Sequence, residues 1–294
     1  MTRLLDLPSS VLTTLDRRDL VDSVRESEGR VMAAETIGAY QPLLEDVTNA
    51  ELVAGFGADL LICNLFDVDT PSIAGLPECA PDDVIRTLKE LTGRVVGINL
   101  EPFGVPAGRL ATAANASRAV ALGVQFIVVT ANPKTGVDNA SIAASVREVS
   151  DAVGDAAMVV GGRMHGSGML AESGSRIVGV EDVRGFVEAG ADMVLLPAPG
   201  TVPGITAEHI HHLIDTAHDL GALALTAIGT SQEGADPATI RAIALACKQA
   251  GADVHHLGDG GYSGISAPEN VFHYSVAIRG VRHTYRRMGW SIRR

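Results

Sequence analysis

Four residues that can move protons stand close to the ends of apolar, strand-like runs. They are Glu35, Glu101, His165 and His256. Carboxylates and imidazoles serve as general acids and bases, and they are also common ligands of divalent cations. We therefore predict a catalytic role for all four, with Glu101 and His165 as candidate ligands of Mg²⁺ or another divalent cation. For Glu35, Glu101 and His165, the competing interpretation is a structural hydrogen bond at the rim.

Two adjacent histidines occur in the last of these runs, and only one of them can face the same way as the strand's other inward residues. We assign the inward position to His256, because His255 shares its face with Leu257, which suits an apolar helix layer. A packed core histidine is the alternative interpretation for His256.

Four further polar residues at strand ends are candidates for substrate binding: Asn64, Asn99, Asn132 and Arg163. Residues two apart on a strand share a face, so Arg163 is expected to point the same way as His165. The guanidinium group of Arg163 could bind a substrate carboxylate or phosphate, or it could form a buried salt bridge to Glu101 or Glu35.

Two glycine-rich stretches follow the last two apolar runs. Gly229, Thr230 and Ser231 belong to the first stretch, and Gly258, Asp259, Gly260 and Gly261 belong to the second. Glycine lets backbone N–H groups approach an anion closely, and hydroxyl groups add donors. These stretches predict a phosphate-binding site, and a pair of tight turns is the alternative.

A regular spacing of glycines predicts the fold that positions these residues. Eight glycines follow apparent helices, and neighbouring ones are between 28 and 36 residues apart: Gly29, Gly57, Gly93, Gly123, Gly154, Gly190, Gly221 and Gly251. The residue after a helix is often left-handed, which glycine tolerates. One strand and one helix together occupy about 30 residues. We therefore predict a single (β/α)8 TIM barrel over residues 29–294, with the chemistry at its carboxyl-terminal mouth.

The eight strands are predicted to be parallel, because most are continuous apolar runs. Their expected ranges are 30–36, 59–64, 94–101, 124–132, 156–165, 191–197, 222–228 and 252–257. Residues 1–28 form a helical extension, with a helix at 18–27 that could cover the bottom of the barrel. Helix starts are predicted by the capping boxes Thr48 with Glu51 and Ser266 with Glu269, and by Asp236 before Pro237.

Composition limits the possible partners of this 294-residue chain. Its formal net charge of −12 argues against sequence-independent nucleic-acid binding, which relies on cationic surface. Three widely spaced cysteines predict neither a disulfide framework nor a zinc site, and the sequence has no signal segment and no long apolar run. We expect a cytoplasmic protein that acts on a small anionic metabolite and does not bind a membrane.

Arginines gather near the C-terminus: Arg279, Arg282, Arg286, Arg287, Arg293 and Arg294. The expected role is a solvated or salt-bridged surface that complements the negative end of a helix. Such a surface could also be an interface in a homo-oligomer.

Several segments resemble a bacterial family of barrel proteins that is labelled either phosphoenolpyruvate phosphonomutase-like or haloacid-dehalogenase-like. The segments are 49–52, 61–69, 196–204, 226–236 and 255–261. The resemblance covers nearly the whole chain and implies a barrel and phosphorylated carbon substrates. It brings no catalytic residues, since Asp67-Val68-Asp69-Thr70 looks like a phosphatase motif of an open-sheet fold and the lysine-cysteine-glycine-histidine loop of phosphonomutase relatives is absent.

The leading hypothesis is a lyase or isomerase that forms an enolate-like intermediate from a phosphorylated or carboxylated metabolite. A metal-dependent hydrolase, with His165, His256 and the carboxylates around zinc or manganese, stays open. A sensor or scaffold that binds a metabolite without turnover stays open as well.

Overall fold

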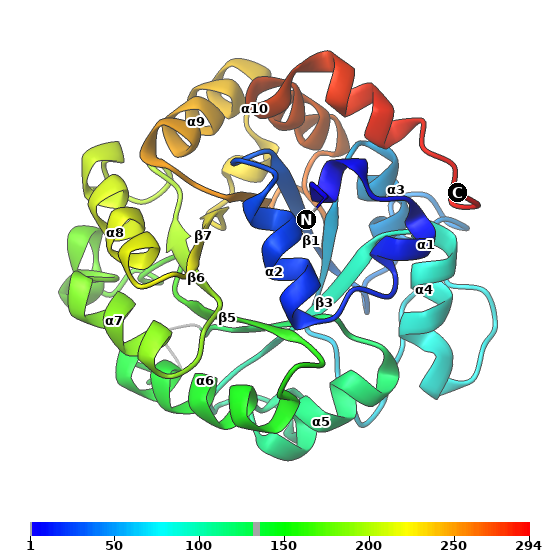
Figure 1. Ribbon diagram of the computed structural model, residues 1–294, viewed down its shortest axis with the longest axis horizontal. Helices are drawn as coiled ribbons and strands as arrows, with labels where there is room; N and C mark the ends of the chain where they lie inside the picture. The colour runs from blue at the N-terminus through cyan, green and yellow to red at the C-terminus, as the bar shows by residue number, and fades with distance from the viewer. Residues whose placement is uncertain (1, 132–135) are drawn as a thin grey trace.

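Eight parallel strands close into a barrel in chain order, with β8 paired to β1 (Figure 1). The strands are β1 (Val31–Ile37), β2 (Leu60–Asn64), β3 (Val95–Leu100), β4 (Phe126–Val129), β5 (Met158–Gly162), β6 (Met193–Pro197), β7 (Leu223–Ile228) and β8 (Val254–Leu257). This computed structural model describes residues 2–131 and 136–294. The predicted TIM barrel is confirmed.

All eight spaced glycines have positive φ, from 51° at Gly154 to 112° at Gly57. Gly93, Gly123 and Gly251 are C-caps in the left-handed region. The spacing predicted the fold because each strand-and-helix unit reverses direction at such a residue.

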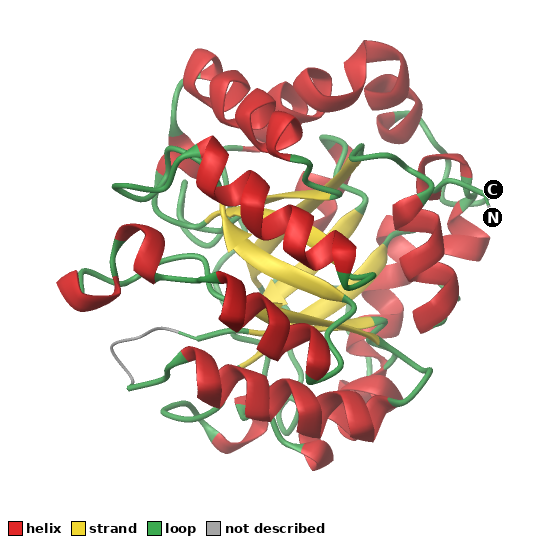
Figure 2. Ribbon diagram, turned by 60° about the vertical axis from the view of Figure 1, so that its left-hand side comes forward, coloured by secondary structure: helices red, strands yellow, loops and turns green. Residues whose placement is uncertain are grey.

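Helices surround the barrel, which lies inside them (Figure 2). They are α1 (Ser9–Leu12), α2 (Arg17–Arg25), α3 (Asn49–Gly55), α4 (Val84–Thr92), α5 (Ala113–Leu122), α6 (Asn139–Val153), α7 (Val180–Glu188), α8 (Ala207–Asp219), α9 (Pro237–Ala250) and α10 (Pro268–Met288). No helix among the described residues has the length and hydrophobicity that crossing a membrane requires.

Alternate residues of each strand enter two separate cores. Residues such as Met32 and Leu61 pack outward against the helices. Residues such as Ala33 and Ile62 point into the barrel and join a second cluster that includes Leu20 of the N-terminal segment. The helix α2 therefore covers the bottom of the barrel, as expected from the sequence (Figure 1). This parity decides which side chains can reach the mouth.

Two of the three predicted helix starts are confirmed. Thr48 and Glu51 form a reciprocal capping box, and Asp236 accepts hydrogen bonds from two backbone N–H groups of α9. The prediction for Ser266 is wrong, because Pro268 occupies the first turn of α10 and Ala267 is its N-cap. Proline sets the helix start by its fixed φ and missing N–H.

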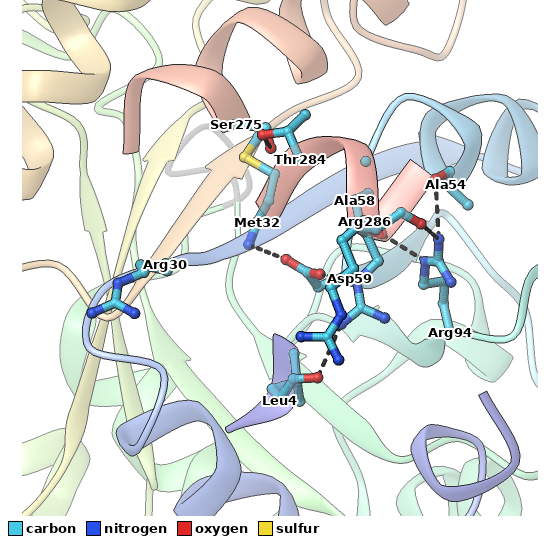
Figure 3. A network of polar contacts seen from close by, with 12 residues as sticks. Leu4, Arg30, Met32, Ala54, Ala58, Asp59, Arg94, Ser275, Thr284 and Arg286 are labelled. Carbon is cyan, nitrogen blue, oxygen red and sulfur yellow. Dashed lines mark hydrogen bonds and ion pairs between the residues drawn. The ribbon is translucent and has the colours of Figure 1, made fainter. Parts of the chain in front are cut away.

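The arginine-rich C-terminus is partly buried, which corrects the surface interpretation for two of its members. Arg279 and Arg287 form ion pairs with Asp59, and all three side chains are at most 2% exposed. Asp59 also accepts a hydrogen bond from the Met32 N–H at 2.8 Å, and Arg94 donates to the carbonyl of Ala58 (Figure 3). Burial alone would raise the pKa of Asp59, but the arginines outweigh it and lower the pKa.

Candidate active site

A cavity of about 330 Å³ opens at the carboxyl ends of the strands. Eleven of the residues predicted for the site line it: Glu35, Asn64, Asn99, Glu101, His165, Gly229, Thr230, Ser231, Gly258, Asp259 and Gly260. Residues from the ends of β1, β2, β3, β5, β7 and β8, or from the loops that follow these strands, therefore meet at one opening. Their catalytic and binding roles stay predictions.

A chain of side-chain amides connects two carboxylates across the mouth. Asn99 Nδ2 donates to Glu35 and, at 3.2 Å, to Asn64 Oδ1. Asn64 Nδ2 in turn donates to Asp259 Oδ2 at 2.8 Å. Strands β1, β2 and β3 present Glu35, Asn64 and Asn99 from their inward faces, so the sheet itself fixes this order.

His256 contacts Glu35 but is not itself among the residues that line the cavity. Its Nε2 is 3.3 Å from Glu35 Oε2, and its side chain is 1% exposed. His255 points the other way, 3.2 Å from the Tyr274 hydroxyl and 3.1 Å from the Gly29 carbonyl, and burial lowers its pKa to about 3. The choice of His256 as the inward histidine agrees with the structure.

Asp259 has a strongly perturbed acidity. Burial and the negative charge of Glu35 raise its pKa to about 6, against the lowering effects of the Asn64 hydrogen bond and of His256. A carboxyl group with such a pKa can hold or release a proton near neutral pH, which is the property of a general acid or base.

Glu233 is a pocket residue that the sequence interpretation did not select. It lies in a short 3₁₀ turn, Gln232–Gly234, and Asn270 Nδ2 donates hydrogen bonds to the carbonyl groups of Glu233 and Ala235. The side chain lines the cavity, and the residue is only 1% exposed. Burial raises the pKa of Glu233, and the charges of Asp259 and Glu35 raise it further.

The glycines of the last loop make room for the Glu233 carboxylate. A Cβ atom on Gly258 would lie 2.7 Å from Glu233 Oε1, and one on Gly260 would lie 3.3 Å from the same oxygen. Gly261 does not line the cavity, and a Cβ atom there would lie 2.9 Å from the backbone of Glu233. The glycine-rich stretch that the sequence suggests as a phosphate-binding loop thus lies close to Glu233. The phosphate site itself stays a prediction.

Arg163 and His165 do not share a face, contrary to the expectation. Strand β5 ends at Gly162, whose φ is 152°, so strand alternation does not continue to the next residues. His165 lines the cavity and lies 2.9 Å from the Ser167 hydroxyl, and burial lowers its pKa. Arg163 is buried, is not a lining residue, and donates to the Val137 carbonyl at 2.7 Å.

Among the residues that the structure describes, no set of side chains matches the predicted metal site. No group of three His, Cys, Asp or Glu side chains is arranged there to hold a metal ion. Glu101 forms an ion pair with Arg109 at 3.0 Å. Asn132, the remaining predicted binding residue, falls outside the described residues.

Backbone strain is concentrated at the mouth. Of four described non-glycine residues with positive φ, Leu65 and Ser231 line the cavity and Ser167 contacts His165. Each such conformation costs about 1–3 kcal/mol, and strain of this kind clusters at functional sites. The pocket at the mouth of this TIM barrel therefore combines acids of perturbed pKa with strained backbone conformations.

The chain belongs to the family described as "Domain of unknown function (DUF7916)", whose model matches residues 5–294. No curated protein matches this sequence.

Solved structures share the fold. A 2,3-dimethylmalate lyase of the PEP mutase/isocitrate lyase superfamily is 16% identical, with a TM-score of 0.51 over 82% of this chain and 80% of that one. A phosphonopyruvate hydrolase in complex with oxalate and Mg²⁺ is 13% identical, with a TM-score of 0.50 and the same two coverages. Thiamine phosphate pyrophosphorylase from Pyrococcus furiosus is 10% identical, with a TM-score of 0.50 over 85% of this chain and 96% of that one.

These neighbours include a lyase, a hydrolase and an enzyme of phosphate-metabolite chemistry. At such low identity they show the fold alone, a TIM barrel, which the open-sheet dehalogenase label does not describe. The activity has to be argued from the cavity.

Proposed function

We propose that the chain is an enzyme that transfers a proton on a small metabolite, as a lyase or isomerase with an enolate-like intermediate. One observation carries this proposal: the cavity holds Asp259, with a pKa raised to about 6, joined through two amides to the base candidate Glu35. Neighbouring acids with different environments are the arrangement that acid and base catalysis requires.

The contacts support a division of roles. Glu35, oriented by Asn99 and backed by His256, takes the proton from a carbon next to a carbonyl group. The protonated carboxyl group of Asp259 donates to the carbonyl oxygen as negative charge develops there. Asn64 donates a hydrogen bond to Asp259, and Asn99 donates hydrogen bonds to both Asn64 and Glu35. These bonds hold the acid Asp259 and the base Glu35 in fixed positions relative to each other while the proton moves.

The cavity also restricts the substrate. Its volume of about 330 Å³ lies at the small end of the range for ligand pockets. Several carboxylates line the cavity, and no lysine or arginine does among the described residues. We place a phosphorylated or carboxylated end of the substrate away from Asp259, next to the exposed Ser231 and its neighbour Thr230.

Deuterium exchange tests the proposal while the substrate is still unidentified. The protein is incubated in D₂O with 2-oxo acids, hydroxy acids and sugar phosphates, and NMR follows the loss of protons next to carbonyl groups. We expect exchange or turnover with at least one compound. Glu35→Gln should lower the rate by about 100-fold or more, in line with the usual contribution of a general base.

The matched control is Glu181→Gln, because the Glu181 side chain is 90% exposed on α7, outside the cavity lining. It should leave the exchange rate unchanged. Absence of exchange and turnover across the panel, or equal rates in wild type and Glu35→Gln, contradicts the proposal. Ligand binding without any reaction would instead favour the sensor hypothesis.

A further inference from the structure

Some of the acidic side chains that line the cavity have a basic partner close by, and others do not. Glu101 pairs with Arg109, and Glu35 lies against His256. Glu233 and Asp259 have no arginine or lysine partner among the described residues. Burial and a neighbouring carboxylate raise the pKa of each, and among these residues only His256 is a nearby positive charge that lowers it. The side of the cavity formed by Glu233 and Asp259 therefore has more negative charge than the single nearby imidazole of His256 can balance.

Among the side chains that line this cavity, two carry a buried polar atom that lacks a hydrogen-bond partner within the described chain. One is Glu233 Oε2, on a residue that is 1% exposed, and the other is Asn99 Oδ1, on a residue that is 8% exposed. Both atoms are acceptors. Buried acceptors without donors are costly, and folded proteins leave few of them. The cavity is thus prepared for a ligand that brings hydrogen-bond donors.

We propose that the cavity recognises a primary ammonium group on its substrate, with Glu233 as the anchor. An ammonium group has three donors, no acceptor and a positive charge, so it matches both the unpartnered oxygen and the unmatched charge. A neutral hydroxyl group would supply a donor but would leave the charge unbalanced. At pH 7.5, which is above the pKa of about 6 of Asp259, a carboxylate or phosphate at this position would be repelled by Glu233 and Asp259.

A compact ammonium group also fits the described side chains better than a metal ion does. The carboxylates contain no group of three ligands in metal-binding arrangement among the residues described. An ammonium group needs only single hydrogen bonds to separated acceptors. This inference deepens the proposed function and rests on it for the cavity's role as a substrate site, since it assigns the substrate an amine at one end.

Three small probes of similar size separate the possible chemistries. They are ethanolamine, ethylene glycol and glycolate, which offer an ammonium, a neutral hydroxyl and a carboxylate group. Binding is followed at pH 7.5 by NMR of ¹³C-methyl methionine, because Met164 lines the cavity and responds locally. Met164→Leu assigns its signal. We expect ethanolamine to bind at least tenfold more tightly than either of the other probes.

Variants locate the ammonium site. Glu233→Gln keeps the shape but removes the charge, and it should weaken ethanolamine binding at least tenfold. The exposed Glu181→Gln should leave binding unchanged. If Glu233→Gln does not fold, Asp259→Asn removes the neighbouring unmatched charge and should weaken binding as well.

Several results would overturn the proposal. They are equal binding of ethylene glycol, preferred binding of glycolate, no binding of ethanolamine, unchanged affinity in the variants, or displacement of ethanolamine by stoichiometric Mg²⁺ alone. The outcome is separable from the proposed function. If ethanolamine binds but no compound undergoes deuterium exchange, only the proposed function is contradicted. If exchange occurs but ethanolamine is not preferred, only the ammonium site is contradicted.

Discussion

Buried carboxyl groups at the two ends of the barrel have pKa values that are shifted in opposite directions. At the bottom, Asp59 is surrounded by Arg279, Arg287 and the Met32 N–H, and the N-terminal segment closes the interior. At the mouth, Asp259 and Glu233 lie beside other carboxylates, and burial raises the pKa of both. The same type of side chain is thus stabilised as an anion at one end and kept protonatable at the other.

This contrast separates the bottom, where the buried carboxylate is paired with arginines, from the mouth, where the carboxyl groups are not. A carboxylate in a matched ion pair has a pKa far below neutral pH, so it does not exchange a proton near neutral pH. An unmatched carboxyl group costs stability when it ionises, but it can exchange a proton or accept a cationic ligand. The strained residues Leu65 and Ser231 also lie at the mouth.

Removal of the bottom carboxylate should give the largest loss of stability. Asp59→Asn leaves the buried Arg279 and Arg287 without their counter-charge, so we expect a loss of about 3–5 kcal/mol. Urea unfolding at pH 7 measures the effect. Asp22→Asn, which removes an exposed pair with Arg25, should cost less than about 1 kcal/mol. Equal losses in the two variants would contradict the stabilising role of the bottom cluster.

The second effect concerns the backbone that places His165 at the mouth. Gly162→Ala puts a Cβ atom 2.1 Å from the Leu195 carbonyl oxygen at a φ of 152°, and we expect a loss of about 2–4 kcal/mol. A Cβ atom added to Gly185 of α7 would meet no neighbour within 4 Å, so Gly185→Ala should be neutral or stabilising by up to about 1 kcal/mol. Thermal unfolding compares the pair, and a neutral Gly162→Ala would refute the strain argument.

At the mouth, a neutral substitution of Asp259 should stabilise the fold. The raised pKa of Asp259 means that the folded protein resists ionisation, so this carboxyl group lowers stability as pH rises from about 4 through about 6. Asp259→Asn should therefore gain roughly 1–3 kcal/mol at pH 8, based on about 1.4 kcal/mol for each unit of pKa shift. The gain should vanish at pH 4. A loss of stability at pH 8 would contradict an unmatched charge.

The smallest effect is expected at the outer edge of the bottom. Partial burial raises the pKa of Asp6, but hydrogen bonds from Arg3 and Arg286 outweigh it and lower the pKa. Its stabilising contribution is present above about pH 4 and is lost as pH falls through the lowered value. Asp6→Asn should cost less than about 1 kcal/mol at pH 7 and nothing at the acid end. Paired urea titrations at pH 7 and pH 3 check this.

Much of the fold could be predicted because its signals are local. Glycines such as Gly57 and Gly123 end each repeat, and strand parity placed His256 inward and Cys63 outward. The helix start at Ser266 was mispredicted because Pro268, two residues on, sets the boundary instead.

The site was less predictable because it depends on contacts between distant segments. Gly162 interrupts strand alternation, so the expected pairing of Arg163 with His165 failed. Glu233 was missed because the glycines at 258 and 260 resemble a phosphate loop in sequence, whereas in space they accommodate this carboxylate. Neither the positive φ of Gly162 nor the close approach of Gly258 to Glu233 has a local sequence signature.

A ¹³C NMR titration of the side-chain carboxyl groups tests the central contrast most directly. Asp59 should remain ionised well below the usual range, Asp259 should titrate at about pH 6, and addition of ethanolamine should lower the pKa of Asp259 without changing Asp59. The contrast is contradicted if Asp259 and Glu233 have ordinary pKa values that do not change when ethanolamine is added.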